Sequence, residues 1–304
     1  MFKKILLFSC LIIIIPFIIV TIFIRNDEIT FNFSNNTMIR VYRENIGVID
    51  EVPIEEYVLG VLAGEMPIEF ELEALKAQAV AARSYVMAQV EKNVKKEYDV
   101  VDTVMNQVYL DKEYLLTVWS ESYIDNINKI KMAVLSTKGE YISYNGHVAE
   151  ALFFSTSPGV TENSEDVFTS KVSYLRSVES KWDEISPVYI TNKTFSLSEF
   201  YNLLGLDYDD DLDIEITSTT STGRIKNIKI NGETFTGSNV CSKLGLRSTF
   251  FEIIKEAEKI IVKNKGYGHG VGMSQYGAEG MAKAGYNYQD ILKYYYTGIE
   301  IKKF

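Results

Sequence analysis

Glu65 is the residue whose sequence surroundings best suit acid–base chemistry. It lies in Gly64-Glu65-Met66-Pro67, between helices predicted over residues 54–62 and 71–90, because glycine ends a helix and proline forbids its continuation. A carboxyl group enclosed by apolar residues is a typical general acid, since the loss of hydration raises its pKa towards neutrality. The alternative from the local sequence is that Glu65 caps a helix or forms a structural ion pair with Lys76.

The helix predicted after this corner is amphipathic. Its apolar residues recur at helical spacing, namely Leu75, Ala79, Ala82, Val86 and Val90. Lys76 and Arg83 lie two turns apart on it, so both can point the same way, towards the Glu65 corner. They are therefore candidates for positioning a substrate or a loop.

Two polar stretches in the middle of the chain contain groups that can line a groove. Residues 155–166 form a polar loop longer than a hairpin needs, and ligands bind to such loops on a rigid scaffold. The alternative is a simple turn at Ser-Pro-Gly. Further on, Tyr174, Arg176 and Asp183 are spaced so that all three can face the same groove.

A glycine-rich segment near the end of the chain, GYGHGVGMSQYGA, occupies residues 266–278. A structural strand would avoid alternating glycines because each costs conformational entropy, so this spacing indicates close approach of the backbone to a ligand or another chain. His269 is a candidate polar contact in a cleft, and the alternative is a structural histidine that makes a hydrogen bond.

The elements that must position these residues alternate between strands and helices. Strands are predicted at residues 38–42 and 46–52, and a single helix at residues 114–131. Asn145-Gly146 and Asn231-Gly232 indicate hairpin turns, while Ser196 and Glu199 form a capping box. The sequence predicts an α+β fold with a single mixed domain over residues 38–304, which carries a substrate groove.

The N-terminus has the pattern of a membrane anchor. Residues 5–24 form an uncharged apolar run long enough to span a bilayer, and Lys3 and Lys4 precede it. The positive-inside rule then predicts a cytoplasmic tail at residues 1–4, a tether at residues 25–37 and an extracytoplasmic domain in a single-pass protein of the cell membrane. No small residues that suit signal cleavage follow the run, which favours an uncleaved anchor.

Composition excludes several classes of function. The net charge of −10 argues against nucleic acid as a partner, because phosphate binding needs clustered Lys and Arg. Only two cysteines and two histidines are present, and one cysteine, Cys10, lies in the predicted anchor. We therefore expect no disulfide in the soluble part, no metal site of the usual His/Cys kind and no cofactor.

Five segments together resemble the stage II sporulation protein D family of endospore-forming bacteria. They are EEYVLGVLAGEMP, ALKAQAVAARSY, TSPGVTENSEDVF, SYLRSVES and GYGHGVGMSQYGAEGMA, in the order in which the family has them. The resemblance implies a lytic transglycosylase that cleaves between N-acetylmuramic acid and N-acetylglucosamine in peptide-stripped peptidoglycan strands and leaves 1,6-anhydro ends. It further implies action during forespore engulfment, beside a cell-wall amidase and other membrane proteins of a complex.

The resemblance also implies roles for individual residues. Glu65 matches the family's catalytic acid, and one carboxylate suffices because the 6-hydroxyl of the muramic acid attacks C1. Lys76 and Arg83 match the family's basic helix positions, and Tyr174 with Arg176 its Tyr-Leu-basic segment, with Asp183 beyond. The polar lining of the groove is then expected from Ser155, Ser157, Glu162, His269, Ser274 and Gln275.

Two other functions stay open at this point. Relatives of the family include amidase enhancers, in which the same domain binds glycan or activates an amidase without cutting. A scaffold in a membrane complex is the third possibility. Some family members carry a metal near the loop after the hairpin, but residues 155–166 contain no cysteine, which argues against a thiolate site here.

Overall fold

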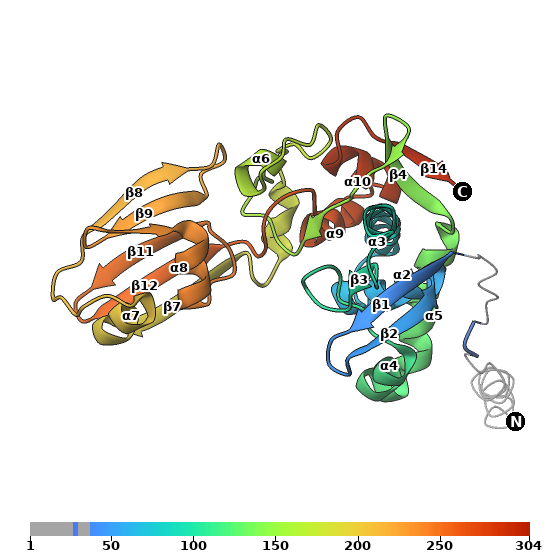
Figure 1. Cartoon of the computed structure of the whole chain (residues 1–304), viewed down its shortest axis with the longest axis horizontal. Helices are drawn as coiled ribbons and strands as arrows, with labels where there is room; N and C mark the ends of the chain where they lie inside the picture. Colours follow the sequence, from blue (N-terminus) through green and yellow to red (C-terminus); the bar gives the residue numbers. More distant parts are fainter. Residues whose placement is uncertain (1–26, 30–36) are drawn as a thin grey trace, which may run out of the picture.

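The computed structural model describes residues 27–29 and 37–304, which form two lobes with separate apolar cores (Figure 1). The second lobe, residues 190–265, is inserted into the main lobe. Its two connections lie side by side, because Lys265 pairs with Ile190 and the Gly266 N–H donates to the Tyr189 carbonyl at 2.9 Å. The α+β class is confirmed, but the apolar residues gather in two cores, whereas the sequence pattern predicts a single domain.

Helix α3 (Leu72–Lys92) is the centre of the main lobe. It packs against α2 (Ile54–Glu65), α5 (Tyr123–Ser136), α9 (Gln275–Lys283) and α10 (Tyr288–Tyr295). The sequence predicts a single buried apolar face for this helix, but α3 is buried on most of its sides. Its many alanines permit this arrangement because small side chains let several helices approach closely.

Two small sheets flank these helices. In one, β1 (Met38–Arg43) pairs antiparallel with β2 (Val48–Pro53), as predicted, and parallel with β3 (Val100–Val101). In the other, β4 (Glu140–Tyr144) lies between β5 (His147–Val148) and β14 (Glu300–Lys303). The hairpin turn predicted at Asn145-Gly146 is confirmed, with φ of +50° and +83° at the two residues.

The second lobe combines two three-stranded sheets with two helices. One sheet contains β8 (Ile214–Thr219), β9 (Ile225–Ile230) and β10 (Glu233–Thr236), and the other β7 (Ile190–Ser196), β11 (Phe251–Glu256) and β12 (Lys259–Lys265). The helices are α7 (Leu197–Leu204) and α8 (Gly237–Leu244). As predicted, the Ser196 hydroxyl caps α7, where it accepts a hydrogen bond from the Glu199 N–H at 3.1 Å.

The single helix predicted over residues 114–131 is wrong. The chain forms α4 (Lys112–Trp119), a short 3₁₀ turn η1 (Ser120–Ser122) and then α5. Ser120 has a φ of +46°, in the left-handed region, which a continuous right-handed helix cannot include.

Four short elements bring distant segments together beneath the candidate site. Strands β6 (Phe153–Phe154) and β13 (Met273–Ser274) pair in parallel, so the glycine-rich segment lies beside the chain that follows the β4–β5 hairpin. Helix α6 (Ser164–Val167) and the 3₁₀ turn η2 (Lys181–Ile185) complete this region. The two sequence regions that carry candidate polar groups are therefore neighbours in space.

The predicted anchor over residues 5–24 and most of the tether over residues 25–37 lie outside the described residues. Among residues 27–29 and 37–304, none of the helices combines the length and the apolar character that a bilayer-spanning segment requires. Of the tether, Ile29 is held against α5, where its N–H donates to the Asn128 side chain at 2.8 Å.

Candidate active site

Glu65 is the last residue of α2, where Met66 turns into an extended conformation and Pro67 follows. One carboxylate oxygen, Oε1, accepts a hydrogen bond from the Val108 N–H at 2.8 Å. The other, Oε2, accepts from Nε2 of Gln275 at 3.3 Å. The carboxyl group therefore lies where α2, the segment before α4 and the start of α9 meet.

The prediction that Gly64 ends the helix is wrong, because α2 includes Gly64 and continues to Glu65. A Cβ atom at this position would lie 2.7 Å from the Val108 carbonyl oxygen, and one at Gly60 would lie 2.5 Å from the Leu110 carbonyl oxygen. Both glycines thus let residues 108–110 pack directly against α2. This close approach places the Val108 N–H within reach of Glu65.

Burial raises the pKa of the Glu65 carboxyl, and this effect outweighs the hydrogen bonds from Val108 and Gln275, which lower it. No charged neighbour contributes to the shift among the described residues. A carboxyl group with a raised pKa that is still partly exposed can hold a proton and deliver it to a ligand. Glu65 therefore has the properties that general-acid chemistry requires.

Asp183 is fully buried and accepts several hydrogen bonds near the start of α9. It accepts hydrogen bonds from the Ser157 N–H at 2.7 Å, from the Ser180 hydroxyl at 2.5 Å and from the Ser274 hydroxyl. Burial raises its pKa to about 6 despite these donors. Because Ser274 caps α9, and Gln275 is the first residue of that helix, Asp183 supports the side of the site from which Gln275 reaches Glu65.

A cavity of about 520 Å³ adjoins the same segments. One wall contains Asn106, two residues before Val108, and another contains Phe153, whose strand pairs with the strand that precedes Gln275. His269 and Phe168 close a third side, with ring centroids 5.6 Å apart. The lining is mostly apolar and aromatic with a few polar groups, which is typical of a site for an organic ligand.

The His269 imidazole accepts a hydrogen bond on Nδ1 from the Val271 N–H at 3.0 Å. Burial lowers its pKa to about 4, so the ring is neutral at neutral pH. The His269 ring therefore combines features of both interpretations. It lines the cavity, as a cleft residue would, and a hydrogen bond holds it, as in a structural histidine.

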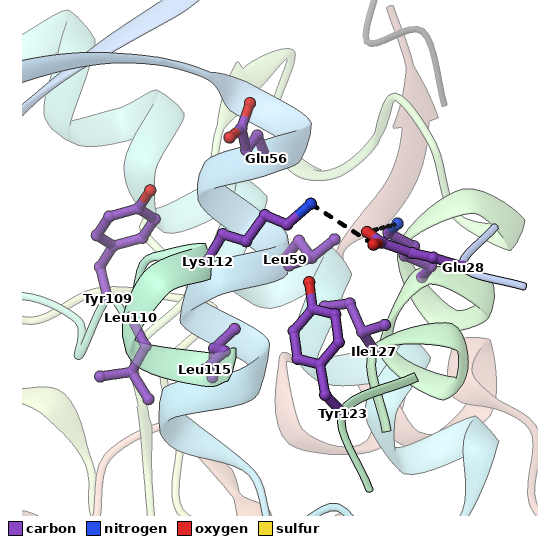
Figure 2. A pocket seen from close by; sticks show the side chains of 10 residues that line it. Glu28, Glu56, Leu59, Tyr109, Leu110, Lys112, Leu115, Tyr123 and Ile127 are labelled. Carbon is purple, nitrogen blue, oxygen red and sulfur yellow. Dashed lines mark hydrogen bonds and ion pairs between the residues drawn. The ribbon is translucent and has the colours of Figure 1, made fainter. Parts of the chain in front are cut away.

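A second cavity, of about 260 Å³, lies elsewhere in the main lobe (Figure 2). It is formed by α2, α4, α5 and Glu28, which pairs with Lys131 at 2.7 Å and with Lys112 at 3.5 Å. None of the residues predicted for the site lines this second cavity, so we do not assign it to the candidate active site.

The structure corrects the expectations for Lys76 and Arg83. Arg83 is fully buried and forms a bidentate ion pair with Glu55, with nitrogen–oxygen distances of 3.0 and 2.6 Å. Lys76 pairs with Glu73 at 2.6 Å and lies over the ring of Tyr288. Neither points towards Glu65, since Arg83 joins α2 to α3 and Lys76 faces α10.

The loop of residues 155–166 is likewise more buried than expected. Ser157 and Glu162 are both inaccessible, with Glu162 paired to Arg224 of the second lobe at 3.2 Å. The Ser155 carbonyl accepts from the Ser274 hydroxyl at 3.2 Å. The expectation that Ser157 and Glu162 line a groove is therefore wrong, because burial keeps both from a ligand.

Tyr174 and Arg176 also have partners within the protein. The Tyr174 hydroxyl accepts a hydrogen bond from the Glu150 N–H at 2.8 Å. Arg176 forms a bidentate pair with Glu165, at 2.8 and 2.6 Å, beside α6. Both side chains thus hold the loops around the cavity together, and of the predicted residues Gln275 is the one whose side chain forms a hydrogen bond with Glu65.

Three contributors were missed by the sequence analysis. Val108 acts through its backbone N–H, which any residue except proline supplies, so no side-chain pattern reveals it. Phe168 is a single aromatic residue in a polar stretch. Arg224 reaches the site from another lobe, and local spacing carries no signal for such a contact.

Among residues 27–29 and 37–304, no group of three or more His, Cys, Asp or Glu side chains is placed to hold a metal ion. Cys241 is a free cysteine of the second lobe.

Comparison with known proteins gives consistent matches. A family model described as "Stage II sporulation protein" matches residues 42–144, which include Glu65. Stage II sporulation protein D of Bacillus subtilis (strain 168) is 45% identical over 270 residues, covering 87% of this chain and 79% of that protein. The protein of the same name from Bacillus amyloliquefaciens is 44% identical over 268 residues, covering 86% of this chain and 78% of that protein. An amidase enhancer of Bacillus subtilis (strain 168) is 30% identical over 300 residues, covering 81% of this chain and 40% of that protein.

Proposed function

The chain belongs to the stage II sporulation protein D family, and from this premise we propose that it is a peptidoglycan lytic transglycosylase. Its substrate is the bond between N-acetylmuramic acid and N-acetylglucosamine in glycan strands from which the stem peptides have been removed. The observation that supports this most directly is Glu65, a mostly buried carboxyl group with a raised pKa that Val108 and Gln275 hold by hydrogen bonds.

Glu65 performs both proton transfers in the proposed reaction. Its carboxyl proton passes to the glycosidic oxygen as the bond from that oxygen to C1 of the muramic acid breaks. The 6-hydroxyl of the same sugar then attacks C1, and its proton passes to the Glu65 carboxylate. The product is a 1,6-anhydro ring, and Glu65 ends the cycle protonated, so no water and no second carboxylate take part.

The surroundings of Glu65 fit these two roles. The Val108 N–H and the Gln275 amide donate to its oxygens and stabilise the carboxylate that forms halfway through the cycle. Asp183, the nearby buried carboxyl, is held by the Ser157 N–H and by the Ser180 and Ser274 hydroxyls. A carboxylate whose oxygens are committed to internal donors is poorly suited to activating water, which hydrolysis would require.

The biological setting is part of the same proposal. A sporulation protein with an anchor at residues 5–24 would act on the wall outside the cell membrane during engulfment of the forespore. Its partners would be a cell-wall amidase that strips the stem peptides and other membrane proteins of that complex.

The test is digestion of peptide-free glycan strands by the full chain in mild detergent, followed by mass spectrometry of the products. Wild type should yield 1,6-anhydromuramic ends. Glu65→Gln should lose roughly 10²- to 10⁴-fold in rate, because it removes the transferable proton. Glu69→Gln, a change of the same kind at an exposed neighbour, is the matched control and should keep wild-type activity.

Products with reducing ends would instead indicate hydrolysis and contradict the transglycosylase proposal. Binding of the strands without cleavage would favour the second candidate function, an activator of a cell-wall amidase. The similarity to a protein named amidase enhancer is the specific observation that supports this second candidate.

A further inference from the structure

The two lobes meet at the turn between β8 and β9 of the second lobe, residues 220–224. On the main-lobe side this turn faces residues 162–166. The Ser221 hydroxyl donates to Asp166 at 2.7 Å and accepts from the Asn163 amide at 3.1 Å, and Lys226 pairs with Asp166 at 2.8 Å. These contacts are partly exposed and lie around a buried centre.

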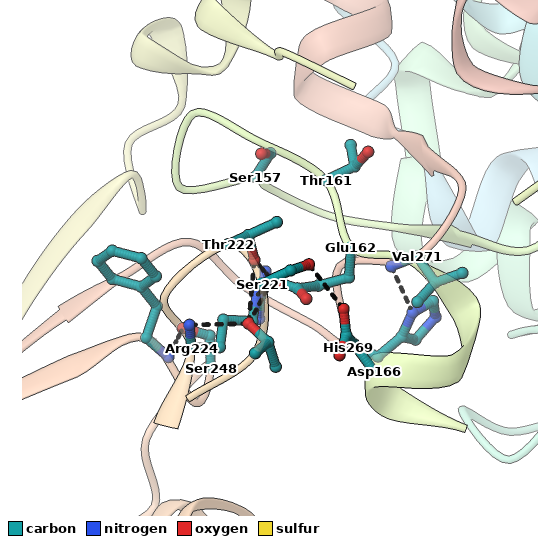
Figure 3. A network of polar contacts seen from close by, with 12 residues as sticks. Ser157, Thr161, Glu162, Asp166, Ser221, Thr222, Arg224, Ser248, His269 and Val271 are labelled. Atoms are coloured by element: carbon teal, nitrogen blue, oxygen red, sulfur yellow. Dashed lines mark hydrogen bonds and ion pairs between the residues drawn. The ribbon is translucent and has the colours of Figure 1, made fainter. Parts of the chain in front are cut away.

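The centre of this contact is an ion pair removed from water. Arg224 approaches Glu162 at 3.2 Å, with side-chain exposures of 1% and 0% (Figure 3). The Thr222 hydroxyl also donates to Glu162. Nη1 of Arg224 donates to the Gly268 carbonyl at 3.0 Å, so the guanidinium bridges the polar loop and the glycine-rich loop.

Gly270 shows how closely the guanidinium lies against the glycine-rich loop. A Cβ atom there would be 2.6 Å from Nη2 of Arg224, and the residue has a φ of +89°. The Gly270 carbonyl accepts from the Glu162 N–H at 2.7 Å. Arg224 and Glu162 thus hold the backbone on both sides of His269, whose ring lines the cavity of about 520 Å³.

The pair is not arranged for stability alone. Nε and Nη2 of Arg224 and Oε2 of Glu162 are buried without a hydrogen-bond partner in the part of the chain that the structure describes, although Nε lies 3.2 Å from Oε1 of Glu162. Leaving such atoms unpaired costs free energy, and an apolar pair of similar volume would join two lobes at least as firmly. A charged pair with directional contacts to Gly268 instead fixes where the loop lies.

We infer that Arg224 is a positioning residue, through which the second lobe holds the loops that carry His269 and Phe168 and so sets the shape of the cavity that these two side chains line. Arg224 touches no reacting atom in this arrangement. The inference rests on the proposed function only where it concerns glycan binding, since the positioning of the loops is a property of the protein itself.

The experiment separates positioning from stability with a double-variant cycle. The full chain is prepared as wild type, Arg224→Met, Glu162→Leu and the double variant, and Lys226→Met serves as a control at the same lobe contact. For each protein we would measure thermal unfolding and the amide hydrogen exchange of residues 160–170 and 266–272. We would also measure kcat and KM on peptide-free glycan strands. Arg224→Lys tests whether charge alone is sufficient.

Each single variant should lower the unfolding temperature, because it leaves a buried charge without its partner. In the double variant the unfolding temperature should return most of the way to the wild-type value. Its amide hydrogen exchange in both segments should nevertheless stay at least tenfold faster than in wild type. The KM of the double variant should stay at least tenfold higher than the wild-type KM, whereas its kcat should change less. Arg224→Lys should lie between wild type and Arg224→Met, since lysine lacks the planar fork that reaches both loops.

Wild-type exchange in the double variant would overturn the inference and leave the pair a purely structural one. An equal effect of Lys226→Met would also overturn it, because any contact between the lobes would then suffice. If wild type does not cleave glycan, the proposed function fails, while hydrogen exchange still decides whether Arg224 holds these loops.

Discussion

At Glu65, burial and hydrogen bonding act on one carboxyl group in opposite directions. Burial disfavours the charge, whereas the Val108 N–H and the Gln275 amide stabilise it, and the net result is a raised pKa. In the proposed reaction the group gives up a proton and then takes one back, and this role benefits from both influences. The residue therefore needs a dry site and a few fixed donors rather than a neighbouring charge.

The pH dependence of the proposed activity follows from this balance. The protonated form starts the reaction, so the rate should fall as pH rises through the raised pKa of Glu65. In Gln275→Leu a donor that favours the carboxylate is lost, and the alkaline limb of kcat/KM should move to higher pH. Rate profiles of both proteins on peptide-free strands check this, and a limb that stays in place or moves to lower pH would contradict the role given to Gln275.

Asp183 should make folding stability depend on pH. Its pKa is about 6 in the folded protein against an ordinary 3.8, so the folded state binds the extra proton and its stability falls as pH rises between those values. Relative to Asp183→Asn, wild type should be more stable at pH 4.5 than at pH 7 by about 2 kcal/mol. Urea unfolding of both proteins at each pH measures the difference, and a constant difference would show that Asp183 does not titrate in this range.

At the scale of elements, α2 and α3 are joined by a pair of charged residues rather than by apolar packing alone. Arg83 on α3 binds both oxygens of Glu55 on α2 and also donates to the Glu140 carbonyl at 2.9 Å. The pair lies inside the core, so it fixes how the helix that ends at Glu65 sits on the central helix. Because Arg83 is fully buried, we expect it to act on the site through the fold rather than by contact with a ligand.

This arrangement predicts what loss of Arg83 does. Arg83→Met should cost about 3–5 kcal/mol in the free energy of unfolding, because Glu55 is left buried and unpaired. Adding Glu55→Leu should recover that loss except for about 1–3 kcal/mol, since the buried Gly139 N–H also loses its acceptor. Glycan cleavage should return together with stability in the double variant.

Urea unfolding and cleavage assays of the same preparations provide the measurements. Lys76→Met is the control, because its pair with Glu73 is partly exposed and should contribute no more than about 0.5 kcal/mol. A double variant that is stable but inactive would favour a direct role of Arg83 with substrate, as the family resemblance implies.

At the scale of the whole molecule, the second lobe is an insertion with its own core. Its core contains Phe200, Val240 and Ile260, and its two connections to the main lobe lie side by side (Figure 1). Glu65, Asp183 and the segments that hold them all belong to the main lobe. The second lobe contacts the glycine-rich loop through Arg224 of the β8–β9 turn and through Arg247, whose carbonyl accepts from the Gly268 N–H at 2.9 Å.

Removal of this lobe should therefore separate folding from binding. A chain in which a short Gly-Ser linker replaces residues 191–264 should keep the helical circular dichroism and a cooperative unfolding transition, because the core around α3 is intact. Its affinity for peptide-free glycan should fall at least tenfold, because Arg224 no longer holds the cavity loops. Titration with glycan strands checks this, and wild-type affinity in the shortened chain would contradict it.

Much of the local structure was predictable from the sequence, because short-range chemistry determines it. The Asn145-Gly146 turn and the Ser196 cap each depend on a few adjacent residues. The family, too, was recognisable from linear motifs. Long-range contacts were not, and the break at Ser120 shows that even local conformation yields to packing when propensities are weak.

The α+β class, the family and Glu65 as the candidate acid follow from residue types and their spacing along the chain. The burial of Arg83 and Glu162 in ion pairs, the hydrogen bonds from Val108 and Gln275 to Glu65, and the contribution of Arg224 by a second lobe are visible only in the folded chain. The physical reason is that burial and hydrogen-bond partners depend on segments far apart in the chain, whose meeting no local pattern records.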